Sequence, residues 1–248
     1  MRFVFTPTWF IGKDVLIEAF SFIVLFIFSI LAIRSYKLNK NRKFLYLGTG
    51  FALIGLAQFA NVLTKLVLYY DVGPSQQIGA AIVAAHVLSS VDIFYYVGFF
   101  LHKFLTLSGL YIICRLPREH RSIWDSILII YFIVISALGS QEIFYLFHIT
   151  ALVILLFIGY NYYKLYMRNQ FKNTLILLFA FLFLGLSQLI YILSPVETMY
   201  VLANILELIT YIVLLILVVI ILYYGKKTKP NGHHIRHVSD NSRKKKRN

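Results

Sequence analysis

The chain has little of what a soluble protein is made of. Only 14% of its 248 residues are charged and 60% are hydrophobic, whereas roughly a quarter of the residues in an average soluble domain are charged. The one cysteine, Cys114, excludes a disulfide within the chain. No Asn-x-Ser/Thr acceptor for N-glycosylation occurs. A soluble globular domain and a small disulfide-linked secreted domain are therefore both excluded.

Catalytic and cofactor motifs are also missing. The sequence contains no Walker loop, no zincin helix, no nucleophile elbow and no Cys-x-x-Cys pair. No lysine lies between Lys172 and Lys226, which excludes a retinal Schiff base in the last apolar run. Residues 113–116 read Ile-Cys-Arg-Leu, without the Asp/Glu-Arg-Tyr signature of G-protein-coupled receptors. We expect a protein that is not an enzyme and that holds no metal or cofactor.

Long apolar runs are what the sequence does have. A run of roughly 18 residues or more crosses a ~30 Å hydrocarbon core as a helix, because lipid forces the backbone to pair within the run. We predict an all-α membrane protein in which residues 1–224 form a seven-helix transmembrane domain, its first helix serving as the insertion signal. The predicted spans are Val15–Arg34, Phe44–Tyr70, Ala80–Cys114, Ile123–Leu138, Ile143–Tyr163, Asn173–Leu193 and Tyr200–Tyr224. The third is too long for one perpendicular span, so it tilts, projects, or begins with a separate surface helix within residues 76–88.

Lysine and arginine gather in alternate connections between these spans. The connections after the first, third and fifth spans are basic, as is the C-terminal tail, whereas the other side carries only Arg2, Lys13 and Lys65. This bias predicts a multi-pass protein of the cell membrane with its N-terminus outside and its C-terminus in the cytoplasm. The formal net charge of +14 reflects the basic loops and tail, so we expect no nucleic-acid partner.

The tail, residues 225–248, is short, polar and basic, and we predict that it is disordered. It ends in a run of five cations that is expected to contact anionic lipid headgroups. These cations are Arg243, Lys244, Lys245, Lys246 and Arg247. A topological retention signal without a partner is the alternative interpretation of the same run.

Two parts of the chain resemble each other. Residues 51–58 (FALIGLAQ) match residues 181–188 (FLFLGLSQ), and the Tyr-Lys-Leu triplet at 36–38 recurs at 163–165. The matches place the first three predicted helices parallel to the last three, with the fourth as a linker. They predict a 3+1+3 parallel repeat about an axis along the membrane normal. A chance match among common apolar residues is the alternative.

Acidic residues extend this match to the third and seventh spans. Asp92 with Tyr96 one turn later parallels Glu207 with Tyr211. In topology the 3+1+3 arrangement resembles the sugar-transporter and PQ-loop families. Those families carry prolines inside their helices, whereas the five prolines of this chain all lie in termini or connections. The proline hinge that the resemblance implies is therefore absent from these spans.

Polar residues inside a membrane are costly, so their depth is informative. Six of the seven predicted spans place a polar residue at similar depth in the outer half, and we predict that these residues line a pocket open to the outside. The predicted pocket residues are Gln58, Asp92, His148, Gln188 and Glu207, with Tyr96 and Tyr211 nearby. Its carboxylates would favour a cation, a hydrogen-bonding ligand or a proton. The alternative is that these residues only join helices through hydrogen bonds of ~0.6 kcal/mol each.

Histidines and a lysine in the spans leave further alternatives open. His86 and His148, on separate spans, could ligate a haem, but one interfacial and one core histidine is the favoured interpretation, because two histidines on separate helices are a poor haem signal. Lys103 follows Asp92 by eleven residues on nearly the same helix face. We predict that the Lys103 side chain extends to the cytoplasmic surface.

The bundle with its basic inner loops is similar to membrane sensor regions that precede histidine kinases. This resemblance implies a non-enzymatic sensor or receptor-like module that acts through a separate membrane or cytoplasmic protein partner. A small-solute or ion transporter, with Asp92 and Glu207 as coupling carboxylates, is the second hypothesis. A haem-binding membrane subunit is the third.

Overall fold

The computed structural model describes residues 6–70, 80–115, 123–140 and 142–227, and this part of the chain contains α-helices and one 3-10 turn but no strand. The helices are η1 (Thr8–Phe10), α1 (Lys13–Asn39), α2 (Arg42–Tyr70), α3 (Ala80–Cys114), α4 (Ile123–Gly139), α5 (Tyr145–Asn169), α6 (Lys172–Tyr191) and α7 (Glu197–Lys227). The prediction of an all-helical protein is confirmed. Each predicted span lies on one of the seven α-helices, and α3 runs without a break from Ala80.

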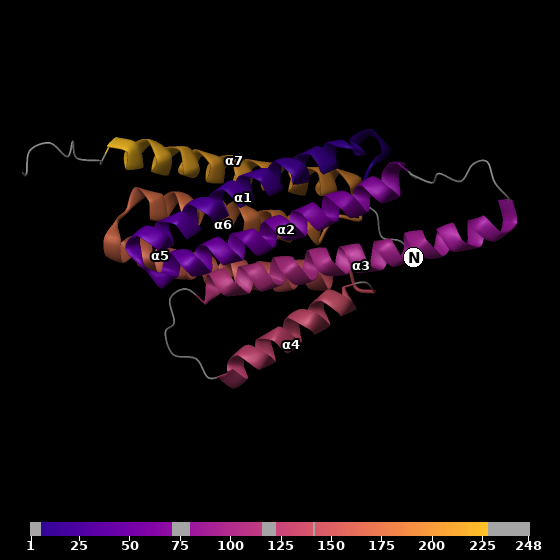
Figure 1. The fold of residues 1–248 in the computed structure, drawn as a ribbon, viewed down its shortest axis with the longest axis horizontal. Coiled ribbons are helices and arrows are strands. Elements are labelled where there is room, and N and C mark those ends of the chain that lie inside the picture. Colours follow the sequence, from indigo (N-terminus) through magenta and orange to yellow (C-terminus); the bar gives the residue numbers. More distant parts are fainter. Residues whose placement is uncertain (1–5, 71–79, 116–122, 141, 228–248) are drawn as a thin grey trace, which may run out of the picture.

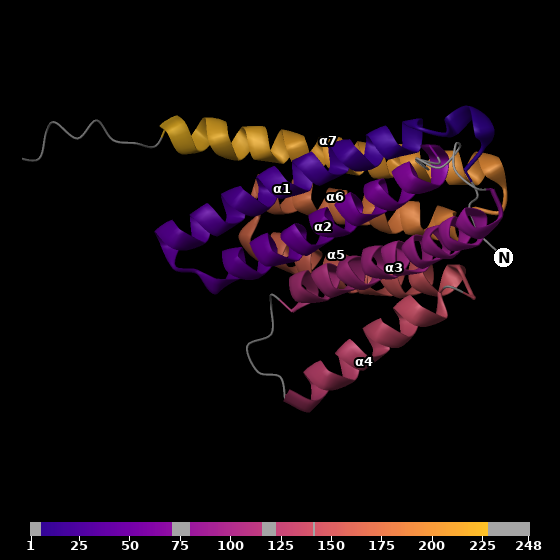
Figure 2. The same cartoon turned by 45° about the vertical axis from the view of Figure 1, so that its right-hand side comes forward.

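Six of the helices form a closed ring. In order around the ring, α1 packs on α2, α2 on α3, α3 on α5, α5 on α6, α6 on α7, and α7 on α1 again. Among the described residues, helix α4 packs mainly against α3 and α5, and it diverges from the bundle in two views (Figures 1 and 2). The ring therefore encloses an interior to which α4 contributes little.

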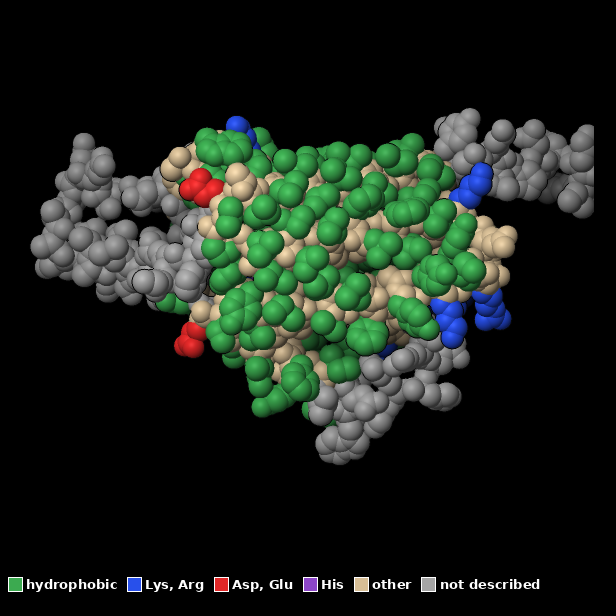
Figure 3. Space-filling view, turned by 180° about the vertical axis from the view of Figure 1, so that it is seen from behind, with side chains coloured by type: hydrophobic (Ala, Val, Ile, Leu, Met, Phe, Trp, Pro, Cys, Tyr) green, Lys and Arg blue, Asp and Glu red, His purple; other side chains and the backbone are tan. Residues whose placement is uncertain are grey.

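The surface of the bundle suits a lipid environment. Six helices of the described chain are long and apolar enough to cross a membrane, and α4 adds a shorter apolar stretch at Ile129–Gly139. Hydrophobic side chains cover the middle of the face in Figure 3, while most of the visible Lys and Arg side chains lie at one end and the Asp and Glu side chains at the other. These features indicate a multi-pass membrane protein, because apolar surface of this extent is stable only in lipid.

One half of the ring interior is filled by aromatic and aliphatic side chains. Phe51 of α2 stacks on Phe181 of α6, with ring centroids 6.1 Å apart and an interplanar angle of 9°. Phe28 and Tyr162 pack on the outer sides of this pair, at centroid distances of 4.6 Å from Phe51 and 5.3 Å from Phe181. This dry layer lies toward the end of the bundle where α1 and α5 end and α2 and α6 begin.

Helices α2 and α3 approach most closely at two glycines. A methyl group built on Gly109 would lie 2.6 Å from the backbone oxygen of Gly50, which is too close for any side chain. Gly98 lies in the same way against Thr64 further along both helices. Small residues permit such close packing of helices in lipid, where dispersion between backbones replaces the hydrophobic effect. This contact fixes the position of α3 along α2, and thereby the side chains that α3 presents to the interior.

Candidate functional site

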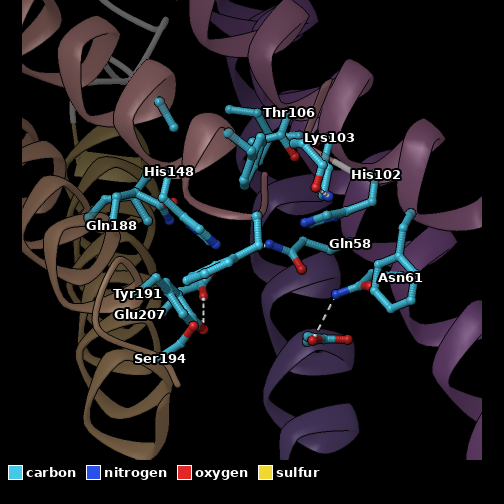
Figure 4. Close-up of a pocket in the computed structure, with 18 of the residues that line it drawn as sticks. Gln58, Asn61, His102, Lys103, Thr106, His148, Gln188, Tyr191, Ser194 and Glu207 are labelled. Carbon is cyan, nitrogen blue, oxygen red and sulfur yellow. Dashed lines mark hydrogen bonds between the residues drawn. The ribbon is translucent and has the colours of Figure 1, made fainter. Parts of the chain in front are cut away.

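A cavity of about 180 Å³ lies inside the ring, in the half opposite the aromatic layer. It reaches Thr6, Tyr69 and Ser194 at the end of the bundle where α1 and α7 begin, and Leu110 and Leu155 at its depth. Its polar lining includes Glu18, Gln58, Asn61, Lys65, Tyr96, His102, Lys103, Thr106, His148, Gln188, Tyr191, Tyr200, Glu207 and Tyr211. In Figure 4, residues of α5, α6 and α7 face residues of α2 and α3 across it.

Glu207 is the centre of one hydrogen-bond network in this cavity. Its Oε1 accepts from Gln58 Nε2 at 3.1 Å and from the Tyr211 hydroxyl at 2.9 Å, while Oε2 accepts from the Tyr191 hydroxyl at 3.0 Å. Gln58 Nε2 also donates to the Tyr211 oxygen at 3.2 Å. Three donors, one each from α2, α6 and α7, thus hold one carboxylate in place, as buried polar groups require.

His148 of α5 forms the opposite wall. Its Nδ1 lies 2.8 Å from Gln188 Oε1, so that nitrogen donates to the amide oxygen. The imidazole ring stacks on Tyr191 at a centroid distance of 5.0 Å and an angle of 18°. Tyr191 therefore links the histidine to Glu207. The cavity is lined by six of the predicted pocket residues: Gln58, Tyr96, His148, Gln188, Glu207 and Tyr211.

A buried ion cluster lies between the cavity and the end of the bundle, and the sequence analysis did not find it. Lys65 Nζ lies 2.7 Å from Asp14 Oδ2 and 2.5 Å from Glu18 Oε1, and it donates to the Tyr200 hydroxyl at 3.1 Å. Lys65 is 6% exposed, Glu18 7% and Asp14 fully buried. Tyr69 donates its hydroxyl to Asp14 Oδ2 at 2.8 Å. We define Asp14, Glu18 and Lys65 as the ion cluster.

The role given to Lys65 in the sequence analysis was therefore wrong in one respect. It was counted among the few charges of the outer connections, but it lies inside the bundle as the shared partner of two carboxylates. Asp14 and Glu18 are spaced i, i+4 on α1, which places both on one helix face. A lysine inside a predicted span, together with two carboxylates spaced i, i+4 at the start of another span, is the signal that could have revealed the cluster.

Helix α3 supplies the third wall, and here the structure corrects the predicted position of Lys103. The Lys103 ammonium donates to the backbone oxygen of Ser140 at 2.9 Å. Ser140 follows the end of α4, on the acidic side of the bundle, so Lys103 does not extend toward the basic end. The neighbouring His102 places its Nδ1 3.1 Å from the Ala57 oxygen. Both side chains line the cavity.

The register of α3 also separates Asp92 from the predicted layer. His102 is level with Ala57, next to Gln58, and Asp92 precedes His102 by ten residues, a distance of about 15 Å along a helix. The backbone of Asp92 therefore lies nearer the end of the bundle than Gln58, and not at the same depth in the membrane as predicted. Its side chain and that of His86 lie outside the described residues, so their roles stay predictions. Tyr96 lines the cavity with half of its surface exposed.

Two further predictions concern parts of the chain that the structure does not describe or groups that it does not contain. The tail cations at residues 243–247 lie outside the described residues, and their contact with anionic lipid stays a prediction. No group of three or more His, Cys, Asp or Glu with metal-binding geometry occurs within the described ranges. A haem held by His148 would need His86, whose side chain is not described.

Comparisons with protein-family models, curated proteins and solved structures find no match to this chain.

Proposed function

We propose that the protein is a seven-span protein of the cell membrane with its N-terminus outside and its tail in the cytoplasm. The distribution of charge supports this orientation. Lys40, Arg42 and Lys172 are exposed at one end of the ring, and the exposed carboxylates Glu142 and Glu197 lie at the other. Cytoplasmic loops carry the excess of lysine and arginine in membrane proteins. The 17 residues of α4 are at the short limit for a seventh span.

We further propose that α1–α2–α3 and α5–α6–α7 are a parallel repeat. A constant offset of 130 residues relates Phe51 to Phe181 and Gln58 to Gln188, and it also relates the helix boundaries Asn39 and Asn169. Both boundaries are followed by a left-handed residue, Lys40 or Gln170, whose N–H donates 2.7 Å to the oxygen of a tyrosine. These tyrosines are Tyr36 and Tyr166, so Tyr166 replaces Tyr163 as the equivalent of Tyr36.

Packing supports the same offset. A Cβ built on Gly55 would lie 3.5 Å from Leu25 Cβ, and one built on Gly185 would lie 3.8 Å from Leu155 Cβ. Each glycine thus faces the equivalent leucine of the preceding helix. Phe51 and Phe181 stack on each other, as equivalent residues do when they lie beside a two-fold axis. The cyclic order of the helices also stays the same when α1, α2 and α3 are exchanged with α5, α6 and α7, as a two-fold repeat requires.

We infer that the protein is a non-enzymatic sensor or receptor-like module that binds a small polar ligand in the cavity. The observation that carries this proposal is a cavity of about 180 Å³ lined by polar side chains from six helices. Interhelical glue requires only pairs of polar groups, whereas this lining surrounds a space that could hold a ligand. A soluble or membrane protein partner would receive the signal.

The aromatic layer distinguishes the sensor from the transporter hypothesis. A transporter must open its site to both sides of the membrane. Beyond Leu110 and Leu155, the described interior is occupied by a hydrophobic cluster that includes Phe28, Phe51 and Phe181. The geometry therefore favours binding from the outer side without passage.

Thermal unfolding of the detergent-purified protein against a panel of cations and small polar solutes tests this function. We expect at least one solute to raise the unfolding midpoint in a saturable way. Glu207→Gln should abolish the shift, because it removes the anchored charge, whereas Glu142→Gln, an exposed carboxylate at the same end, should retain it. Uptake of that solute into proteoliposomes should be undetectable. Rapid uptake that requires Glu207 would favour the transporter instead.

A further inference from the structure

Two sets of polar side chains that line the cavity have unused hydrogen-bonding capacity. One set lacks donors and the other lacks acceptors. Glu18 Oε2, Asn61 Oδ1 and Thr106 Oγ1 are buried and have no hydrogen-bond partner among the described residues. Glu18 and Asn61 are each 7% exposed. Buried polar atoms without a partner are rare in native proteins, and each needs an explanation.

The first set consists of acceptors. Glu18 Oε1 is engaged by Lys65 and by Asn61 Nδ2, the latter at 2.9 Å. This bond brings the two side chains together and leaves the second oxygen of each, Glu18 Oε2 and Asn61 Oδ1, without a donor. Two neighbouring acceptors, one of them on a carboxylate, match the N–H groups of an ammonium.

The second set consists of donors on α3. Within the described chain, the ammonium of Lys103 has one hydrogen-bond acceptor, the Ser140 oxygen, and no carboxylate within salt-bridge distance. A lysine carries three donors. Thr106 lies one turn further on the same helix face, and its hydroxyl oxygen is buried without a partner. An anionic group can accept hydrogen bonds from both side chains.

The two sets lie at different ends of one cavity. Figure 4 shows Thr106 and Lys103 toward one end and Asn61 toward the other, with Gln58 between them. The volume of about 180 Å³ slightly exceeds that of an engineered 150 Å³ cavity that holds benzene. A ligand of roughly six to ten non-hydrogen atoms therefore fits the space.

We infer that the cavity binds a zwitterion of amino-acid size, with its anionic group on Lys103 and Thr106 and its amine on Glu18 and Asn61. This inference rests on the proposed function, for which it specifies the ligand class. A lone amine would leave Lys103 without an anion, and a lone carboxylate would leave the Glu18 oxygen without a donor. Only a ligand that carries both groups supplies partners for both sets.

Matched solutes test the inference on the full-length protein in detergent. The thermal unfolding midpoint is titrated with 4-aminobutyrate and alanine, with the single-charge analogues butylamine, butyrate, ethylamine and propionate, and with neutral butanol. We expect a saturable rise with at least one zwitterion and an affinity at least tenfold weaker for its single-charge analogues, since each loses a charge-assisted hydrogen bond.

Two conservative variants report on the anion end. Thr106→Val keeps the shape of the side chain and removes its hydroxyl, so zwitterion affinity should fall about tenfold. Ser187→Ala removes another buried hydroxyl without a partner, one that does not line the cavity, and it should leave affinity unchanged. Equal binding by Thr106→Val and wild type would overturn the assignment.

The possible results test the zwitterion assignment and the proposed sensor function separately. If butylamine, butyrate or butanol binds as tightly as the zwitterions and Glu207→Gln abolishes that binding, the zwitterion assignment is overturned and the proposed function stands. If no solute shifts the midpoint of a folded protein, both fail. Zwitterion binding that is lost in Thr106→Val and kept in Ser187→Ala supports both.

Discussion

Removal of the cation from the ion cluster is the most direct test of how this bundle is held together. Lys65 contacts Asp14 Oδ2 at 2.7 Å, Glu18 Oε1 at 2.5 Å and the Tyr200 hydroxyl at 3.1 Å, and its side chain is 7% exposed. Lys65→Met keeps most of the volume but leaves two carboxylates buried without a cation. Breaking a buried pair in this way costs about 3–5 kcal/mol.

For a chain of this length, that cost lowers the unfolding midpoint by roughly 6 to 20 °C. The measurement is thermal unfolding in detergent, followed by circular dichroism. Lys43→Met, which removes an exposed lysine from the basic end of the same helix, is the control and should change the midpoint by less than about 2 °C.

A triple variant separates the charge from the packing. In Asp14→Asn/Glu18→Gln/Lys65→Met the uncompensated charges are gone, so most of the lost stability should return, as replacement of a whole buried ion pair is often neutral. The reasoning is refuted if Lys65→Met unfolds within about 2 °C of wild type, or if the triple variant is no more stable than the single one.

Two further predictions concern packing and orientation. Gly109→Ala should destabilise the protein by about 1–3 kcal/mol, because the new methyl group meets a backbone oxygen of α2 at 2.6 Å. Gly55→Ala, with 3.5 Å of room, should be tolerated, and equal unfolding midpoints for the two variants would contradict the packing argument. In a Cys114→Ala background, Thr198→Cys should react with a membrane-impermeant maleimide in intact cells, whereas Asn41→Cys should react only after lysis. The reverse pattern would invert the proposed orientation.

The helices could be predicted from the sequence because their signal is local. An apolar run long enough to cross lipid must be helical, whatever it packs against. The predicted boundaries of α3 coincide with those observed, and the end of α2 at Tyr70 does as well. Part of the polar lining of the cavity could be predicted for a related reason, since intramembrane polar residues face the interior of a bundle.

The positions of charged residues near the span ends could not be predicted in the same way. Lys65 lies close enough to the end of α2 to reach either the surface or the interior, and only its contact with α1 determines which. The depth of Lys103 was wrong because the sequence left open which part of the 35-residue α3 crosses the membrane. The contacts of Gly98 and Gly109 with α2 show instead that its C-terminal half is the part that packs in the ring. Register between helices is a tertiary property that the periodicity of one helix does not contain.

The division of the ring into a polar half and a dry half would give the proposed sensor a physical route from a ligand in the cavity to the basic end of the bundle. Gln58 and Gln188 line the cavity on α2 and α6, and Phe51 and Phe181 lie seven residues earlier on the same helices, about two turns away. The two phenylalanines are stacked, so any ligand that changes the spacing of α2 and α6 at the glutamines also acts on this contact. Packed interiors resist gradual deformation and respond by shifting between discrete arrangements. A ligand in the cavity can therefore alter the basic end of the bundle without crossing the aromatic layer, as a sensor requires and a transporter does not.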